Sequence, residues 1–196
     1  MTTQRATTRT LLLIAAFGAL GAVLLTLLAP ATGALAAAAP PAYALVAGVH
    51  SILPFLARRL LGFSWAATAV GAFVGILSVG STALGILVVV PLVVSGAVFD
   101  TVVLVLRRRL RGEAVFAVAA VVSAVALFLV SLPVMSPEHL GPVVMALTFG
   151  GRVAGQLAAW AVSAVIARRV LRAGILRAPA ERPGEHSGET RHDERV

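Results

Sequence analysis

The stretch Ala83–Arg111, ALGILVVVPLVVSGAVFDTVVLVLRRRLR, decides the fold of this chain, because a long apolar run ends in a cluster of arginines. Residues 83–106 contain a single charged side chain, Asp100. A helix that crosses the hydrocarbon core of a bilayer needs about 20 predominantly apolar residues. The stretch therefore predicts a transmembrane helix over 83–106, with a kink at Pro91 and its arginines on the cytoplasmic side.

The rest of the chain repeats this pattern. Of its 196 residues, 59% are hydrophobic and 12% are charged, an apolar share that a soluble domain of this length would not bury. We expect an all-α, polytopic membrane protein with six transmembrane helices. Their expected ranges are Thr10–Ala29, Ala42–Ala57, Phe63–Gly80, Ala83–Leu106, Glu113–Leu132 and Val143–Ala167.

The first apolar run raises the alternative of a cleaved signal peptide, since basic residues precede it and small residues follow it. The run Thr10–Ala29 is longer than the apolar core of a usual signal peptide and long enough to span a bilayer. We therefore expect it to be retained as the first helix. Pro30 is expected to end that helix, and residues 31–41 to form an uncharged loop.

Arginines alternate along the chain with the expected spans. If the N-terminus lies inside, the three outer loops carry no arginine. Every arginine that flanks an expected span then lies in an inner segment. The inner arginines are Arg5, Arg9, Arg58, Arg59, Arg107, Arg108, Arg109, Arg111, Arg168, Arg169, Arg172 and Arg177. Because cytoplasmic loops are enriched in arginine and lysine, the alternation predicts that both termini are cytoplasmic. Residues 1–177 would form the membrane domain, and 178–196 a charged, disordered cytoplasmic tail.

The composition also excludes several functions. The chain has no cysteine and no lysine, so it has no disulfide, no phosphate-loop lysine and no Schiff-base lysine. It lacks a glycine-rich phosphate loop, a nucleophile elbow and a zinc-protease motif. We expect no enzymatic activity, no cofactor and no metal site. The net charge of +8 comes from short arginine clusters beside apolar runs, which indicates membrane topology rather than nucleic-acid binding.

Polar side chains inside the expected spans are candidate binding residues, because charge at bilayer depth is costly. Arg152, Gln156 and Trp160 recur every four residues and share one helix face. This face either lines a polar cavity, or Arg152 extends to the outer interface and Gln156 bonds a neighbouring helix. Asp100 either lines the same cavity or reaches an arginine at the inner interface. His50 fits a hydrogen-bonded interior histidine better than a metal ligand, since no second histidine lies at ligand spacing.

The first expected helix carries small residues one turn apart. Ala15 and Ala19 form an A-x-x-x-A pattern, and Gly18 and Ala22 form G-x-x-x-A. Small residues at this spacing let a second membrane helix approach closely. We therefore take these four residues as a candidate partner-binding face.

These features together resemble the substrate-binding (S) components of energy-coupling factor (ECF) vitamin transporters, and among them the YkoE-like, thiamine-related group. The resemblance rests on six helices with the N-terminus inside, on the A-x-x-x-A pattern of the first helix, and on the segments Ser95–Asp100, Gly151–Gly155 and Arg172–Leu176. It covers about residues 9–177. The chain differs from the family in having Asp100 where glutamate is usual, and in the featureless loop 31–41.

The resemblance implies a division of labour. The chain would lie in the bacterial plasma membrane, bind a water-soluble vitamin from outside, and dock on a coupling membrane subunit and two ABC-type ATPases. The implied vitamin is thiamine or a precursor, and the aromatics Phe149 and Trp160 join the four polar candidates as implied substrate-binding residues. A cationic ligand would suit Asp100 and, by cation–π contact, the aromatics Tyr43, Phe149 and Trp160. Arg152 would instead suit a carboxylate or phosphate.

Two further hypotheses stay open at this point. One is a stand-alone ion- or proton-coupled carrier, in which Asp100 and His50 would be the coupling groups. The chain lacks an evident inverted repeat, which speaks against this class. The other is a membrane scaffold without transport activity, which would bind a partner through its first helix.

Overall fold

A computed structural model describes residues 7–82, 85–110 and 112–174, and every regular element in these ranges is helical. The α-helices are α1 (Thr8–Ala38), α2 (Pro40–Val46), α3 (Ile52–Leu61), α4 (Ala66–Leu77), α5 (Val89–Leu106), α6 (Glu113–Ser131) and α7 (Pro142–Arg172). The short 3₁₀ helices are η1 (Ala47–Ser51), η2 (Val79–Ser81), η3 (Gly85–Val88), η4 (Leu132–Val134) and η5 (Pro137–His139). The all-α expectation is confirmed for the described residues. The expected tail 178–196 lies outside them.

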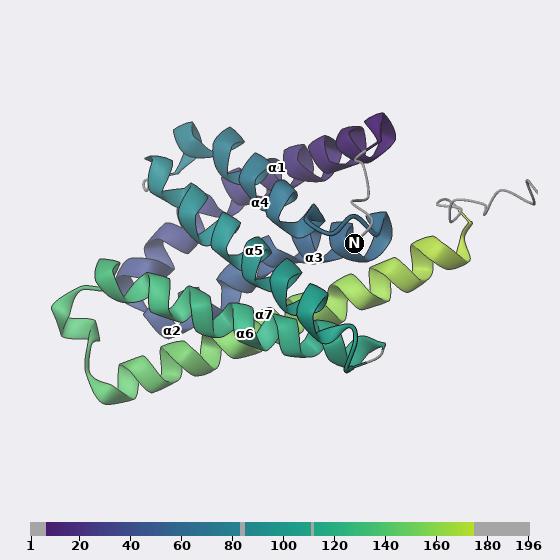
Figure 1. The fold of residues 1–196 in the computed structure, drawn as a ribbon. Coiled ribbons are helices and arrows are strands. Elements are labelled where there is room, and N and C mark those ends of the chain that lie inside the picture. Colours follow the sequence, from purple (N-terminus) through teal and green to yellow (C-terminus); the bar gives the residue numbers. More distant parts are fainter. Residues whose placement is uncertain (1–6, 83–84, 111, 175–196) are drawn as a thin grey trace, which may run out of the picture.

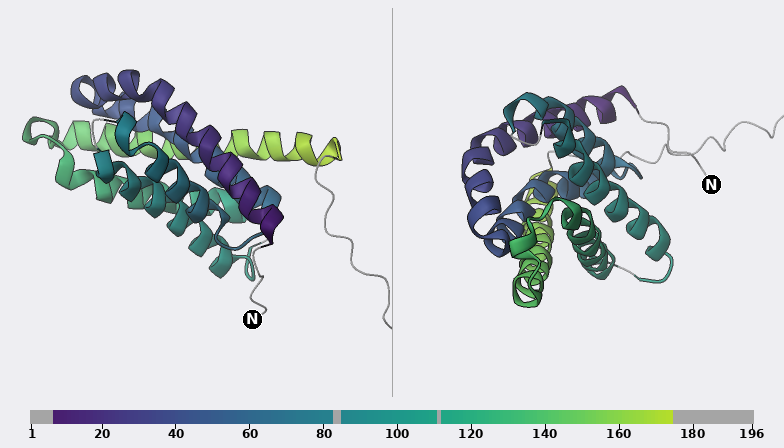
Figure 2. Two further views of the ribbon diagram at one scale, coloured as in Figure 1. Left: turned by 90° about the horizontal axis from the view of Figure 1, so that it is seen from above. Right: turned by 90° about the vertical axis from the view of Figure 1, so that its left-hand side faces the viewer.

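The helices form a bundle in which successive segments run back and forth (Figure 1). The start of α1, the end of α3, the link between α5 and α6, and the end of α7 all lie at one end of the bundle. These are the segments whose arginines alternate in the sequence, so we call this the arginine end and the other the opposite end. The last turns of α7 project beyond the other helices at the arginine end (Figure 2).

Five helical segments within the described residues are long and apolar enough to cross a membrane. They are Thr8–Ala38, Pro40–Leu61, Gly85–Leu106, Glu113–Val134 and Pro142–Arg172. The remaining expected span, Phe63–Gly80, corresponds to α4, which has 12 residues and is about 18 Å long at 1.5 Å per residue. This is shorter than the hydrocarbon core of about 30 Å. The count of six spans and the cytoplasmic placement of both termini therefore stay predictions.

The first helix differs from its expected range, because α1 continues through Pro30 to Ala38. The expected end at Pro30 and the expected loop 31–41 are therefore wrong. The segment after Pro30 is rich in alanine, the strongest helix former. The hydroxyl of Thr32 donates to the carbonyl oxygens of Leu28 at 3.0 Å and Ala29 at 3.2 Å, so a side chain bonds the backbone next to the proline.

The second span is also not the continuous helix expected over Ala42–Ala57, since η1 separates α2 from α3. Pro54 lies in the first turn of α3. Backbone N–H groups in a first turn have no hydrogen-bond partner within the helix, so the N–H that proline lacks is not needed there. Pro91 occupies the same place in α5, directly after η3. We expected a kink at Pro91. In the structure the chain changes from 3₁₀ to α-helical winding just before this residue.

Glycines allow the helix backbones to approach closely. A Cβ atom added at Gly48 in η1 would overlap the backbone of Gly155 in α7, and one added at Gly155 would overlap the carbonyl of Leu45. Between α4 and α5, a Cβ at Gly96 would lie 2.6 Å from the carbonyl oxygen of Ala67. Small residues let membrane helices gain packing energy and weak backbone contacts without a solvent-driven hydrophobic effect.

Two glycines of α7 provide a matched test of this packing. Gly155 lies against α2, whereas a Cβ at Gly150 would meet no atom within 4 Å. We expect Gly155→Ala to lower the free energy of unfolding by about 1–3 kcal/mol through overpacking. Gly150→Ala should be neutral or stabilising by up to about 1 kcal/mol. Thermal unfolding of the purified chain in one detergent measures both, and equal effects of the two changes would contradict the close approach.

Candidate functional site

A cavity of about 330 Å³ lies inside the bundle. Small-molecule sites commonly have volumes of about 300–1,000 Å³, so this cavity is large enough for a small ligand. Its walls come from α1, from the second span, from the segment that joins α4 to α5, and from α5, α6 and α7. It is lined by Leu25, Ala29, Thr32, Gly33, Ala36, Ala37, Tyr43, Ala47, His50, Ser51, Thr82, Val88, Pro91, Leu92, Ser95, Leu127 and Arg152.

The cavity lies toward the opposite end of the bundle. Its lining comes from the last turns of α1, the first residues of the second span, the start of α5, the end of α6 and the first half of α7. A second cavity of about 180 Å³ adjoins it and shares the lining residues Ala36, Tyr43 and Arg152. The second cavity is also lined by Ser131 at the end of α6, by Val134, Met135 and Ser136 after it, and by His139 of η5.

Arg152 is the charged group of this site. The side chain is 6% exposed, and its guanidinium lies 5.5 Å from the centre of the Tyr43 ring, within the range of a cation–π contact. The described residues offer it no carboxylate within salt-bridge distance, and its buried Nε atom has no hydrogen-bond partner among them. Since an unpaired buried charge is costly, a group that binds this guanidinium would gain a large share of its binding energy there.

Further buried polar atoms around the two cavities lack partners among the described residues. They are Nδ1 of His50, Oγ1 of Thr82 and Oγ1 of Thr148. His50 and Thr82 line the larger cavity, and Thr148 lines the smaller one. Nearly all buried polar groups in folded proteins are hydrogen-bonded, so a cluster of unpartnered ones indicates a place for a ligand or water.

A chain of hydrogen bonds forms the inner wall of the larger cavity. The side-chain amide of Gln156, which is fully buried, donates to the hydroxyl of Ser51 at 2.8 Å. That hydroxyl lies 3.4 Å from the hydroxyl of Ser95, and the hydroxyl of Ser123 donates to the Ser95 carbonyl at 3.3 Å. The chain joins α7, η1, α5 and α6, and so orients the two serines that face the cavity.

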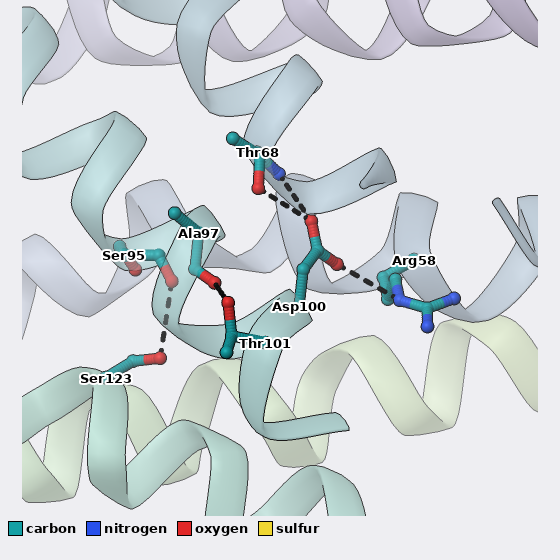
Figure 3. A network of polar contacts seen from close by, with 7 residues as sticks. All are labelled: Arg58, Thr68, Ser95, Ala97, Asp100, Thr101 and Ser123. Atoms are coloured by element: carbon teal, nitrogen blue, oxygen red, sulfur yellow. Dashed lines mark hydrogen bonds and ion pairs between the residues drawn. The ribbon is translucent and has the colours of Figure 1, made fainter. Parts of the chain in front are cut away.

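Asp100 does not line either cavity. Its Oδ1 atom lies 3.0 Å from Nε of Arg58, and its Oδ2 atom accepts from the backbone N–H and the hydroxyl of Thr68, both at 2.8 Å (Figure 3). Asp100 is fully buried and Arg58 is 7% exposed. The structure thus places this carboxylate in an ion pair that joins α3, α4 and α5, which favours the second of the two sequence-based interpretations, an arginine partner.

A second ion pair lies close by at the arginine end. Nη1 of Arg59 donates to both carboxylate oxygens of Glu113 at 2.9 Å, and the same guanidinium lies 4.2 Å from the centre of the Phe116 ring. These contacts join α3 to the start of α6. The two pairs together neutralise the arginines that end α3.

The structure therefore brings together only some of the expected substrate-binding residues. His50 and Arg152 line the larger cavity, and Gln156 reaches it through Ser51. The two aromatic candidates lie elsewhere. Phe149 is 38% exposed and meets Phe128 edge to face, with ring centres 5.3 Å apart, whereas Trp160 packs against the core cluster of Phe55 and Phe99.

The small residues of α1 fall on two faces. Gly18 and Ala22 are buried in the bundle, and a Cβ at Gly18 would overlap the side chain of Phe73 in α4. These two residues thus pack within the chain, which differs from the partner contact expected for them. Ala19 is exposed and Ala15 is partly exposed, so these two remain accessible to a partner.

The sequence analysis did not predict that the last turns of α1 line the larger cavity. Ala29 lines the cavity from the end of the expected first helix, and Gly33, Ala36 and Ala37 line it from the segment expected to be a loop. Their spacing of three and four residues is a helical signal, and it continues the small-residue pattern of the first helix beyond Pro30.

No family model and no curated protein matches this chain. The fold is similar to that of a solved structure described as "Crystal structure of an S-component of ECF transporter". The TM-score is 0.77, the sequence identity is 21%, and the match covers 87% of this chain and 88% of that one. The chain therefore has the fold of an ECF transporter S component.

The ion pair of Asp100 leads to a stability prediction. Asp100→Asn leaves the buried guanidinium of Arg58 without a counter-charge, so we expect a loss of about 3–5 kcal/mol in the free energy of unfolding. Replacing both residues by apolar ones, Arg58→Met with Asp100→Leu, should recover most of it, since no uncompensated charge remains. Thermal unfolding of the purified variants provides the measurement. A double variant as unstable as Asp100→Asn would contradict the pairing.

Proposed function

We propose that this chain is the substrate-specific membrane subunit of an ECF-type ABC importer and binds a water-soluble vitamin. The proposal is supported by the likeness of its fold to an S component across nearly the whole chain. It is supported further by an internal cavity lined by Arg152, His50 and Thr82, each of which has a buried polar atom without a partner among the described residues. A bundle that only anchored or scaffolded a partner would have no need to bury these groups around a cavity.

The position of the cavity carries the proposal. The cavity lies toward the opposite end of the bundle, away from the arginine clusters. Arginine-rich ends of membrane proteins face the cytoplasm. In this orientation the cavity faces the outside, where an importer subunit captures its substrate.

The energy for import would come from other chains. The sequence has no nucleotide-binding motif, so this subunit would bind the vitamin and depend on a coupling membrane subunit and ABC-type ATPases for release. Of the four candidate partner-binding residues, Ala15 and Ala19 are the two that the bundle leaves accessible. A face of small side chains suits close contact with a helix of the coupling subunit. We propose the bacterial plasma membrane as its location.

The carrier hypothesis is less well supported. It needs Asp100 and His50 as coupling groups on one path. Asp100 is bonded to Arg58 and Thr68 and does not line a cavity, whereas His50 lines the larger one. The S-component proposal needs no such path, because it uses the cavity as a binding site.

The first test is ligand binding. We expect the purified chain in nanodiscs to bind one B vitamin or precursor without ATP, with a dissociation constant of about 1 μM or below, which corresponds to about −8 kcal/mol. Thiamine and its precursors, implied by the sequence resemblance, are the first compounds of the panel. Native mass spectrometry and calorimetry provide the measurement. Absence of binding across the panel would contradict the proposal.

A second test separates binding from coupling. Ala19→Phe places a bulky ring on the exposed face of α1, so we expect it to reduce vitamin uptake in cells at least about tenfold while ligand affinity stays unchanged. Ala154→Phe on the exposed face of α7 is the matched control, and it should leave both uptake and affinity unchanged. Equal uptake by the Ala19 variant and the parent chain would remove α1 from the coupling contact.

A further inference from the structure

We propose that the ligand of this cavity carries an anionic oxygen group, a carboxylate or a phosphate, which binds the guanidinium of Arg152. This inference deepens the proposed function and rests on it, because it names the class of vitamin that the cavity selects. The fold does not state the charge of the ligand, and thiamine, the vitamin that the sequence resemblance implies, is a cation. The charges that line the cavity carry the argument.

The balance of charge around Arg152 is the first step. The described residues contain three acidic side chains, Asp100, Glu113 and Glu138. Asp100 and Glu113 are each paired with an arginine at the arginine end, and Glu138 lines neither cavity. The cavity thus has a buried cation and, within the described residues, no acid to balance it. A ligand that supplied the missing negative charge would remove the cost of that burial.

The position of the guanidinium is the second step. Arg152 and Tyr43 line both cavities, so the cation lies where the two meet. The buried Nε of Arg152 has no partner within the described part of the chain. The hydroxyl of Thr148, also unpartnered there, borders the smaller cavity beside it. An anionic oxygen group has several acceptor sites and fits this set of donors.

The other lining residues of the larger cavity suit the rest of such a ligand. Leu25, Val88, Leu92 and Leu127 provide an apolar surface, and small residues of α1 line the cavity as well. The hydroxyls of Ser51 and Ser95 add polar groups to this lining. A ligand with an acidic group at one end and a compact, mostly apolar body with a few polar atoms matches this arrangement.

A cationic ligand fits the cavity less well. Asp100 was the side chain that would have favoured a cation, and both of its oxygens are engaged by Arg58 and Thr68. A positive charge placed in the cavity would meet the guanidinium of Arg152 without a nearby carboxylate, at a repulsive cost that grows as the surroundings become less polar. Among thiamine-related compounds, this inference therefore favours a phosphate ester over the parent cation.

The test uses pairs of compounds that differ in the acidic group. The carboxylate arm pairs nicotinate with nicotinamide, pantothenate with panthenol, and biotin with biotinamide. The phosphate arm pairs pyridoxine with its 5′-phosphate and thiamine with thiamine monophosphate. Calorimetry on the full-length chain in nanodiscs measures the dissociation constants. In the pair that binds, we expect the anionic member to bind about 10–100-fold more tightly, the range of a charge-assisted hydrogen bond.

Variants at Arg152 connect that preference to the guanidinium. Arg152→Gln should bring the affinities of the two members of the pair within about twofold of each other, and Arg152→Lys should retain part of the preference as a point charge. Arg108→Gln removes one arginine from the exposed cluster at the end of α5 and should change neither affinity. Thermal unfolding and gel filtration of each variant establish that it is folded before affinities are compared, and the lysine variant carries the comparison if the glutamine variant does not fold.

The outcomes separate the two proposals. A neutral or cationic member that binds as tightly as its anionic counterpart, or a preference that survives Arg152→Gln, would overturn the inference and leave the proposed function standing. Binding by no compound of the full panel of B vitamins and precursors, these pairs included, would overturn the proposed function and the inference with it.

Discussion

The close contact between the second span and α7 is the constraint on which the site depends. Gly48 and Gly155 lack side chains at the point where the two backbones meet, so η1 lies directly against α7. This places Ser51 within hydrogen-bond distance of Gln156 and brings Tyr43 over the guanidinium of Arg152. A side chain at either glycine would separate the two elements that hold most of the polar groups of the cavity.

Among the described residues, some buried charges of the bundle are paired with an opposite charge, and one is not. At the arginine end, Arg58 and Arg59 are matched by Asp100 and Glu113, and these pairs join three helices, α3, α5 and α6. Toward the opposite end, Arg152 is buried without such a match within the described residues. A paired buried charge holds a structure in one arrangement, whereas an unpaired one leaves binding energy for a ligand. Arginine therefore serves packing at one end, and under the proposed function it serves recognition at the other.

Helical irregularities occur where the cavity is built. α1 continues past Pro30 and lines the cavity with small residues, η1 carries His50 and Ser51, and η3 leads into the first turn of α5. Interrupted helices are tolerated inside a membrane protein where neighbouring elements or a cavity satisfy the exposed backbone groups. In this chain η1 and η3 both contribute residues to the lining of the larger cavity.

The sequence by itself determined the helical class, the position of most apolar segments and the separation of arginines to one end, because lipid imposes a length and a composition on every span. It also pointed to Arg152, Gln156 and His50, since polar groups in apolar runs are few and visible. Only the tertiary structure decided which polar groups meet. Asp100 and Arg152 look alike as buried charges in a sequence, but one faces Arg58 and the other a cavity. Partners distant along the chain, and the helix that passes through Pro30, depend on how neighbouring helices pack.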